Sequence, residues 1–164
     1  MVTEKELEIQ IFEILREVKD PEIPTISLID LGVIKSVKVS PDQKVFIEMT
    51  PTFVGCPAMD YMKNSVEDKL LENGFDLFEV RISFDNPWSS NDITEKGKAD
   101  IKKHGLAPPP YLEKILDIDI LEGVTCPNCN SHDTELQTPF GPTLCRSIHF
   151  CHSCKQAFEQ FKPV

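Results

Sequence analysis

Residues 126–154 read CPNCNSHDTELQTPFGPTLCRSIHFCHSC and carry five of the six cysteines of this 164-residue chain. Four of them form two CxxC pairs, Cys126 with Cys129 and Cys151 with Cys154. This spacing lets two turns converge on one tetrahedral metal ion, and in a reducing compartment it indicates metal ligation more than disulfide formation. The segment has few apolar residues, so we expect the ion to supply much of its folding free energy.

Zinc is the ion that we expect at this site, and a rubredoxin-type iron or an iron–sulfur cluster is the alternative. The fifth cysteine, Cys145, shares a predicted strand face with Ser147 and can approach the metal side, although a packed thiol is its expected role. Four thiolates complete a tetrahedral shell, so no histidine is required as a ligand. The histidines expected to be solvated or structural are His132, His149 and His152.

The residues around the cysteine pairs predict a small sheet. Two runs of strand-forming residues flank a Gly141-Pro142 turn, and a third run follows the second cysteine pair. These predicted strands are 135–140, 143–150 and 157–162. The layout is that of a zinc ribbon, which we place at residues 124–164.

The preceding part of the chain predicts an α+β domain. A Thr3-x-x-Glu6 capping box opens an amphipathic helix, and residues 78–84 alternate apolar and polar side chains as a strand with one covered face does. The element order is α-β-β-α-β, and the crossover rule makes the last strand parallel to a strand of the hairpin before it. We therefore expect a two-layer domain with a mixed sheet at residues 1–107. Its predicted elements are 3–18, 33–39, 45–49, 57–73 and 78–84.

A proline-rich stretch connects the two predicted domains. Residues 108–110 are three successive prolines, which form a stiff segment, and we place the linker at residues 108–123. A weakly amphipathic helix is predicted before it, at residues 91–104. The apolar stretch 115–121 fits either a helix or a strand.

Cys56 stands apart from the other cysteines, in the sequence TPTFVGCP at residues 50–57. It follows a predicted strand and precedes a helix whose first residue we expect to be Pro57. Helix-end amides favour a thiolate, the form that attacks electrophiles and binds soft metals. A simple capping role is the alternative. No histidine close in the sequence completes a Cys-His catalytic pair.

The composition argues against several other classes of protein. A formal net charge of -10 opposes binding to phosphate backbones, so protein partners are expected and nucleic acid is not. No apolar run approaches the ~20 residues of a membrane span. The charged N-terminus lacks the apolar core of a signal peptide, so we expect a cytoplasmic protein.

Four short motifs together resemble the iron–sulfur assembly family that includes the bacterial SufT-like proteins and the eukaryotic cytosolic assembly factors. They are Asp20-Pro21-Glu22, Asp30-Leu31-Gly32, Thr50-Pro51-Thr52 and Gly55-Cys56-Pro57-Ala58. The likeness continues through Asn86-Pro87-Trp88 and the second cysteine pair. Over its full length the chain resembles the D-subunit family of the bacterial phenylacetyl-CoA epoxidases, in which an assembly domain is fused to a ribbon. Asn130 stands where that family usually has glycine.

The resemblance implies a role for Cys56 in handling iron or a cluster, with acidic and hydroxyl residues near it. These are Asp20, Glu22, Thr50 and Thr52. It does not imply catalysis by this chain, because in that system a di-iron subunit, fed by a flavin and ferredoxin-type reductase, epoxidises the ring. The D subunit is thought to help mature or maintain the iron centres.

We therefore expect a non-catalytic accessory protein with structural zinc and a transient iron or iron–sulfur cluster. Its expected partners are the oxygenase and reductase subunits of the epoxidase, or other iron–sulfur client proteins. Two alternatives fit the same sequence. One is a purely structural zinc-binding subunit of the oxygenase, and the other is a thioesterase or transferase with Cys56 as its nucleophile, which the missing local base disfavours.

Overall fold

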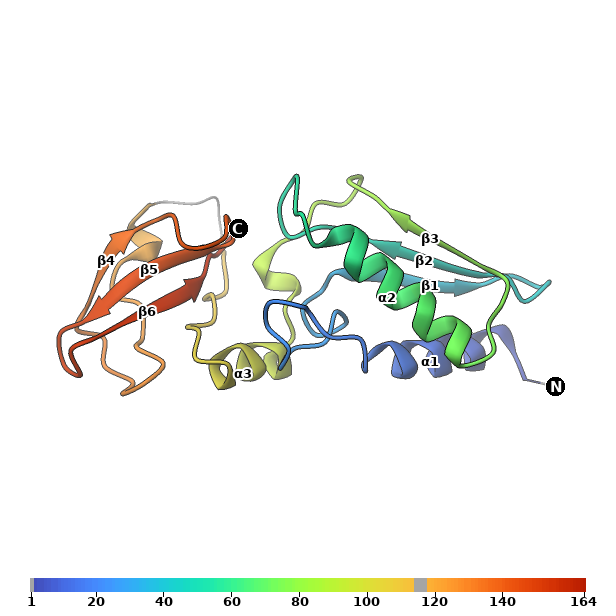
Figure 1. Cartoon of the computed structure of the whole chain (residues 1–164), viewed down its shortest axis with the longest axis horizontal. Helices are drawn as coiled ribbons and strands as arrows, with labels where there is room; N and C mark the ends of the chain where they lie inside the picture. Colours follow the sequence, from blue (N-terminus) through green and yellow to red (C-terminus); the bar gives the residue numbers. More distant parts are fainter. Residues whose placement is uncertain (1, 114–117) are drawn as a thin grey trace. The chain divides into compact units, whose positions relative to one another are not determined.

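The computed structural model describes residues 2–113 and 118–164. Its contacts divide the chain into two compact units, Met1–Trp88 and Ser89–Val164, and Figure 1 labels the elements of each. This boundary precedes the one that the sequence suggests after residue 107. No helix in the described part of the chain is long and apolar enough to cross a membrane.

The first unit contains two helices and a three-stranded sheet, in the order that the sequence predicts. The Thr3 side chain accepts the N–H of Glu6 at 3.2 Å, while the Glu6 carboxylate accepts the N–H of Thr3 at 2.7 Å, so the predicted capping box is confirmed. The elements are α1 (Glu4–Leu15), β1 (Ile34–Val39), β2 (Val45–Met49), α2 (Met59–Glu72) and β3 (Phe78–Ile82).

The sheet of the first unit has the strand order β1-β2-β3. β1 pairs antiparallel with β2, and β3 pairs parallel with β2, with Val45 opposite Phe78 and Met49 opposite Ile82. The predicted mixed sheet is therefore confirmed. α1 packs against β1 and α2 against β3, which buries their apolar stripes. Because β2 and β3 run in parallel, their carboxyl ends meet at one end of the sheet (Figure 1).

The second unit is a three-stranded ribbon preceded by a helix. Its sheet has the order β4-β5-β6, and both strand pairs are antiparallel, with Cys151 opposite Thr134 and Gln156. The predicted ribbon is therefore confirmed. The elements are a 3-10 turn η1 (Ser90–Asp92), α3 (Glu95–Lys103), a second 3-10 turn η2 (Ile118–Leu121), β4 (Thr134–Thr138), β5 (Arg146–Cys151) and β6 (Gln156–Phe161). η2 covers the described part of the stretch 115–121, and the remainder of that stretch lies outside the described residues.

The residue just before the three prolines is part of the second unit. The N–H of Ala107 donates to the Glu159 carbonyl at 2.9 Å, and the N–H of Phe161 donates to the Ala107 carbonyl at 3.0 Å. Ala107 thus adds a short parallel bridge beside β6. It is buried in the same apolar cluster as Val124 and Phe158. The chain that follows α3 is therefore tied to the ribbon.

Candidate metal centre and cysteine loop

The two CxxC pairs occupy matching turns. The N–H of Asn130 donates to the Cys126 carbonyl at 2.9 Å, and the N–H of Lys155 donates to the Cys151 carbonyl at 2.9 Å. Asn130 and Lys155 have φ values of 61° and 59°, the left-handed conformation that turns the chain sharply after each pair. Asparagine adopts this conformation more readily than most residues. The turn at Asn130 therefore forms without a glycine.

The four cysteine sulfurs lie within 4.8 Å of one another. The Sγ atoms of Cys126 and Cys154 are 3.7 Å apart, and those of Cys129 and Cys151 are 3.5 Å apart. Sulfurs at the corners of a tetrahedron, each about 2.3 Å from a central ion, would be about 3.8 Å apart. The observed separations fit this geometry. The four cysteines form a metal-binding site, as their spacing predicts.

The thiols of this site differ in burial and in acidity. Cys126 and Cys151 are buried, Cys154 is half-buried and Cys129 is exposed. The backbone N–H of Cys154 is the main group that lowers the pKa of Cys151, to about 6, whereas burial and the neighbouring thiols raise the pKa of Cys154 to about 12. A cation offsets the repulsion among four thiolates at this range, so metal binding displaces protons. The metal affinity of the site therefore falls as the pH is lowered.

Cys145 lies outside the four-sulfur site. Its Sγ is 3.1 Å from the Thr143 hydroxyl, and the residue precedes β5, whereas Cys151 ends that strand. Its half-buried position fits the expected packed thiol. His149, on β5, is fully buried and stacks on Phe158, and burial lowers the pKa of its imidazole. It is a structural histidine, as expected.

Replacing Lys155 by glycine should stabilise the metal-loaded second unit. A non-glycine residue in the left-handed conformation costs roughly 1–2 kcal/mol, and glycine loses roughly 0.5–1 kcal/mol more chain entropy on folding, so we expect a net gain of about 0.5 kcal/mol. Lys155 is exposed, so no buried contact is lost. Urea unfolding of the zinc-loaded protein measures the gain, at high salt to screen the lost charge. Asn130→Gly is the matched control and should gain less. A lower stability of the Lys155→Gly protein would contradict the expected backbone strain at Lys155.

Cys56 lies in the loop between β2 and α2, residues 50–58, which we term the cysteine loop. α2 begins at Met59 with Ala58 as its N-cap, so the predicted start at Pro57 is too early. The N–H of Met59 donates to the Cys56 carbonyl at 3.4 Å. The half-buried cysteine therefore occupies a turn before the helix and is not its N-cap.

Thr50 ties the cysteine loop to two other segments. Its N–H donates to the Val33 carbonyl at 2.8 Å, and its buried hydroxyl donates to the Asn86 carbonyl at 3.4 Å. Beside it, the indole N–H of Trp88 donates to the Leu31 carbonyl at 2.9 Å. The one hydroxyl proton of Thr50 is used in this way and is not available to a thiolate. Three segments distant in sequence thus meet at the carboxyl ends of β2 and β3.

Asp20 and Glu22 lie in a tight turn that follows α1. The Asp20 carboxylate accepts the N–H groups of Glu22 and Ile23, both at 2.8 Å, so Asp20 orders its own turn. Glu22 is exposed and Thr52 of the cysteine loop is half-buried. The turn and the cysteine loop lie at the same end of the sheet (Figure 1). The predicted site residues therefore share one end of the first unit.

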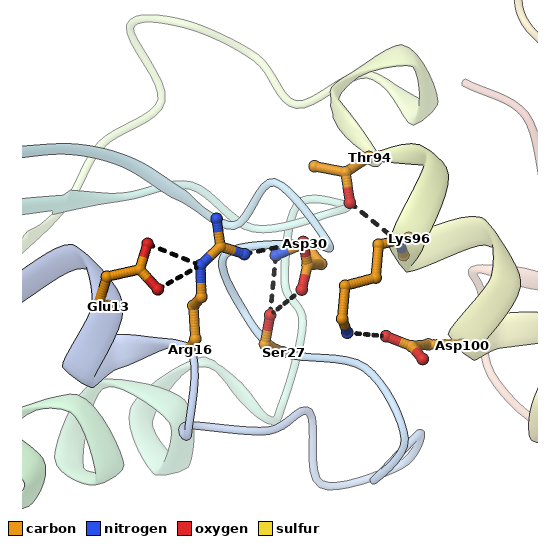
Figure 2. Close-up of polar contacts among 8 residues, drawn as sticks. Glu13, Arg16, Ser27, Asp30, Thr94, Lys96 and Asp100 are labelled. Atoms are coloured by element: carbon orange, nitrogen blue, oxygen red, sulfur yellow. Dashed lines mark hydrogen bonds and ion pairs between the residues drawn. The ribbon is translucent and has the colours of Figure 1, made fainter.

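A buried carboxylate holds the chain between this turn and β1. Asp30, 3% exposed, accepts the Ser27 hydroxyl at 2.7 Å and a guanidinium N–H of Arg16 at 3.2 Å, and Arg16 also pairs with Glu13 (Figure 2). A charge this deeply buried is tolerated only when it is paired and hydrogen-bonded. In the sequence, Asp30 stands out only as part of a family motif. The pattern that could indicate its burial is a single acidic residue inside an otherwise apolar run.

Comparison with known proteins agrees with this two-part description. Residues 8–82 match the family model described as "Iron-sulfur cluster assembly protein", and residues 119–162 match that of the "PaaD zinc beta ribbon domain". Fold and site thus define an assembly-type α+β domain joined to a metal-binding ribbon.

One relative covers nearly the whole chain. It is the D subunit of the "Putative 1,2-phenylacetyl-CoA epoxidase" of Escherichia coli (strain K12), which is 31% identical over 155 residues, or 94% of this chain and 92% of that protein. The chain belongs to the D-subunit family of the 1,2-phenylacetyl-CoA epoxidases. The resemblance noted in the sequence is confirmed.

Two further relatives match a smaller part of the chain. An "Fe-S protein maturation auxiliary factor" of Porphyromonas gingivalis is 33% identical over 92 residues, or 56% of this chain and 87% of that protein. A solved structure, the domain of unknown function DUF59 from Bacillus anthracis, superposes with a TM-score of 0.56 at 25% identity and covers 60% of this chain and 93% of that one. This likeness supports the α+β fold of the first unit.

Proposed function

We propose that this chain is a non-catalytic accessory protein that assists the assembly or maintenance of iron centres in a phenylacetyl-CoA epoxidase system. The observation that carries the proposal is the position of Cys56, a half-buried thiol in a loop at the carboxyl ends of two parallel strands. Ligands often bind at such ends in open sheets. The strands belong to the region that matches the iron–sulfur cluster assembly family, and a relative named as a maturation factor supports the same role.

In this proposal Cys56 takes up iron or an iron–sulfur cluster and passes it to an iron-containing subunit of the oxygenase or its reductase. Glu22 and Thr52 supply polar groups at the same end of the sheet. Asp20 and Thr50 contribute by ordering the turn and the cysteine loop, as their hydrogen bonds support. The protein acts by delivering metal, and the epoxidation takes place on its partners.

The ion of the ribbon is zinc in this proposal. Four cysteine thiolates that close a tetrahedral shell are typical of structural zinc, which keeps no position open for a substrate. The retained ion and the transferred iron then belong to different parts of the chain, because Cys56 and the four ribbon cysteines lie in different units.

Protein purified without oxygen should contain about one zinc per chain and little iron, with four sulfur neighbours at about 2.3 Å in X-ray absorption. Ferrous iron and sulfide added afterwards should load a second site, which Cys56→Ala removes and the control Cys145→Ala keeps. Iron in place of zinc, or fewer than three sulfur neighbours, would contradict the assignment of the ribbon. Unchanged loading of Cys56→Ala would contradict the role of Cys56.

A purely structural zinc-binding subunit is the second candidate, favoured by the completeness of the four-sulfur site. It predicts that the oxygenase keeps its activity with Cys56→Ala and loses it with Cys126→Ala. The accessory function predicts that both variants fail.

A further inference from the structure

A groove of about 550 Å³ opens on the first unit between the turn that follows α1 and helix α2. One wall is formed by Glu17 and Asp20, and the other by Tyr61, Asp68 and Glu72 of α2. Cys56 is not among the residues that line it. The groove is therefore a surface of the same unit that is distinct from the cysteine loop.

The groove carries more negative than positive charge, because four carboxylates and two ammonium groups line it. The Nζ of Lys69 is 2.6 Å from a Glu17 carboxylate oxygen and 3.5 Å from one of Glu72. This pairing engages one of the two cations and lowers the pKa of Glu17. Asp68, one turn before Glu72, adds a further carboxylate to the same helix face.

Glu72 pairs with Lys69 of the same helix, and Asp68 places a second carboxylate four residues before Glu72. Like charges four residues apart repel one another on a helix and destabilise it. The core does not need this face, because the buried stripe of the helix is formed by Met59, Met62, Val66 and Leu70. The repulsion between Asp68 and Glu72 is a local cost to the helix, and such costs are expected where a surface meets a ligand, which here would be a cation.

Tyr61 supplies an aromatic surface at the same groove. Tyr61 is 61% exposed. Arginine and lysine bind the faces of aromatic rings, and exposed tyrosines often anchor protein interfaces. An aromatic ring beside carboxylates is the combination that recognises a guanidinium or ammonium group.

The charge of the whole chain is concentrated on the unit that bears the groove. Residues 1–88 contain nine lysines and arginines against seventeen aspartates and glutamates, a net charge of -8, whereas residues 89–164 carry -2 of the total of -10. We infer that the groove docks a cationic segment, rich in arginine or lysine, of a partner protein. This inference rests on the proposed function only in that it assumes a protein client.

The test is an NMR titration of the full-length, zinc-loaded protein with an acetylated peptide of alternating arginine and glycine. Amide shifts should concentrate on α2 around Tyr61 and Asp68. Tyr61→Ala leaves the net charge unchanged and should weaken binding by about threefold, and Asp68→Lys should weaken it by at least about fivefold. Asp76→Lys is the control, because Asp76 is exposed, lies outside the groove lining and undergoes the same change in charge.

An equal loss of binding in Asp68→Lys and Asp76→Lys would mean diffuse attraction to an acidic surface and would overturn the groove. So would unchanged binding in Tyr61→Ala. The outcome is separate from the proposed function, which is read from iron loading of Cys56→Ala. Selective peptide binding together with unchanged iron loading of Cys56→Ala would support the docking groove and contradict the metal-delivery role. Loss of iron loading in Cys56→Ala without selective peptide binding would contradict only the docking groove.

Discussion

Replacing Cys151 by serine is expected to abolish metal binding and to unfold the ribbon. Structural zinc contributes an apparent ~10–16 kcal/mol to the folding of small modules at pH 7, which exceeds the stability of many whole domains. Serine does not replace a soft thiolate ligand. Among the described residues of the second unit, the apolar cluster beside the metal site has five buried members, and Cys126 and Cys151 are two of them. We expect the buried residues that remain on the strands, among them Phe158 and Phe161, to contribute less free energy than the ion does.

Amide hydrogen exchange measures this effect separately for each unit. In Cys151→Ser the amides of β5 and β6 should exchange as fast as in chelator-treated wild-type protein, while those of β2 stay protected, because the first unit has its own buried core. Cys145→Ser is the matched control, since it makes the same change outside the four-sulfur site. Protected β6 amides in Cys151→Ser would show that the ribbon folds without its full set of ligands.

Replacing Cys56 by serine is expected to lower the rate of iron–sulfur delivery to an apo client by at least tenfold, at unchanged stability. Serine is nearly the same size, and the Cys56 N–H, which donates to the Phe53 carbonyl at 3.3 Å, is retained. A hydroxyl stays protonated at neutral pH, whereas a thiol with a reference pKa of ~8.5 supplies some thiolate, the form that binds iron. The loss should therefore be chemical and not structural.

The measurement is anaerobic reconstitution of the apo reductase with ferrous and ferric iron, sulfide and either form of this protein. Recovery of the cluster absorbance gives the delivery rate, and thermal unfolding verifies the fold. Cys145→Ser controls for loss of a thiol elsewhere in the chain. Delivery by Cys56→Ser at the wild-type rate, together with normal growth on phenylacetate, would rule out metal transfer through this residue.

Much of the fold could be predicted from local sequence patterns, because these patterns show where a helix begins and which face of a helix or strand packs against the core. The Thr3-x-x-Glu6 capping box and the alternation around Val80 concern neighbours within a few residues, and both elements form where expected. The alternation predicts a strand as far as Phe84, but this residue lies beyond β3 and is 58% exposed. The alternating pattern does not show where the pairing of β3 ends, because an apolar residue can also follow a strand.

The four-cysteine site can be predicted from the sequence because one metal ion determines its geometry. The surroundings of the cysteine loop are harder to predict because distant segments form them. The spacing of the cysteine pairs is enough to bring four sulfurs together. No local pattern reveals that Asn86 returns to accept the Thr50 hydroxyl, or that Tyr61 faces a groove. The start of α2 differs from the prediction because proline fits the first turn of a helix but does not require one.

The bridge between Ala107 and Gln160 has a consequence for how the chain is synthesised. All helices and strands of the first unit are complete by residue 82, so that unit can fold while the ribosome is still adding the ribbon. The second unit cannot close until Phe161 has left the exit tunnel and its N–H can reach Ala107. Each newly made molecule therefore presents a finished cysteine loop before its four ribbon thiols have captured their ion. Capture of the metal ion by the ribbon, and not the folding of the first unit, is then the later step in the maturation of the protein.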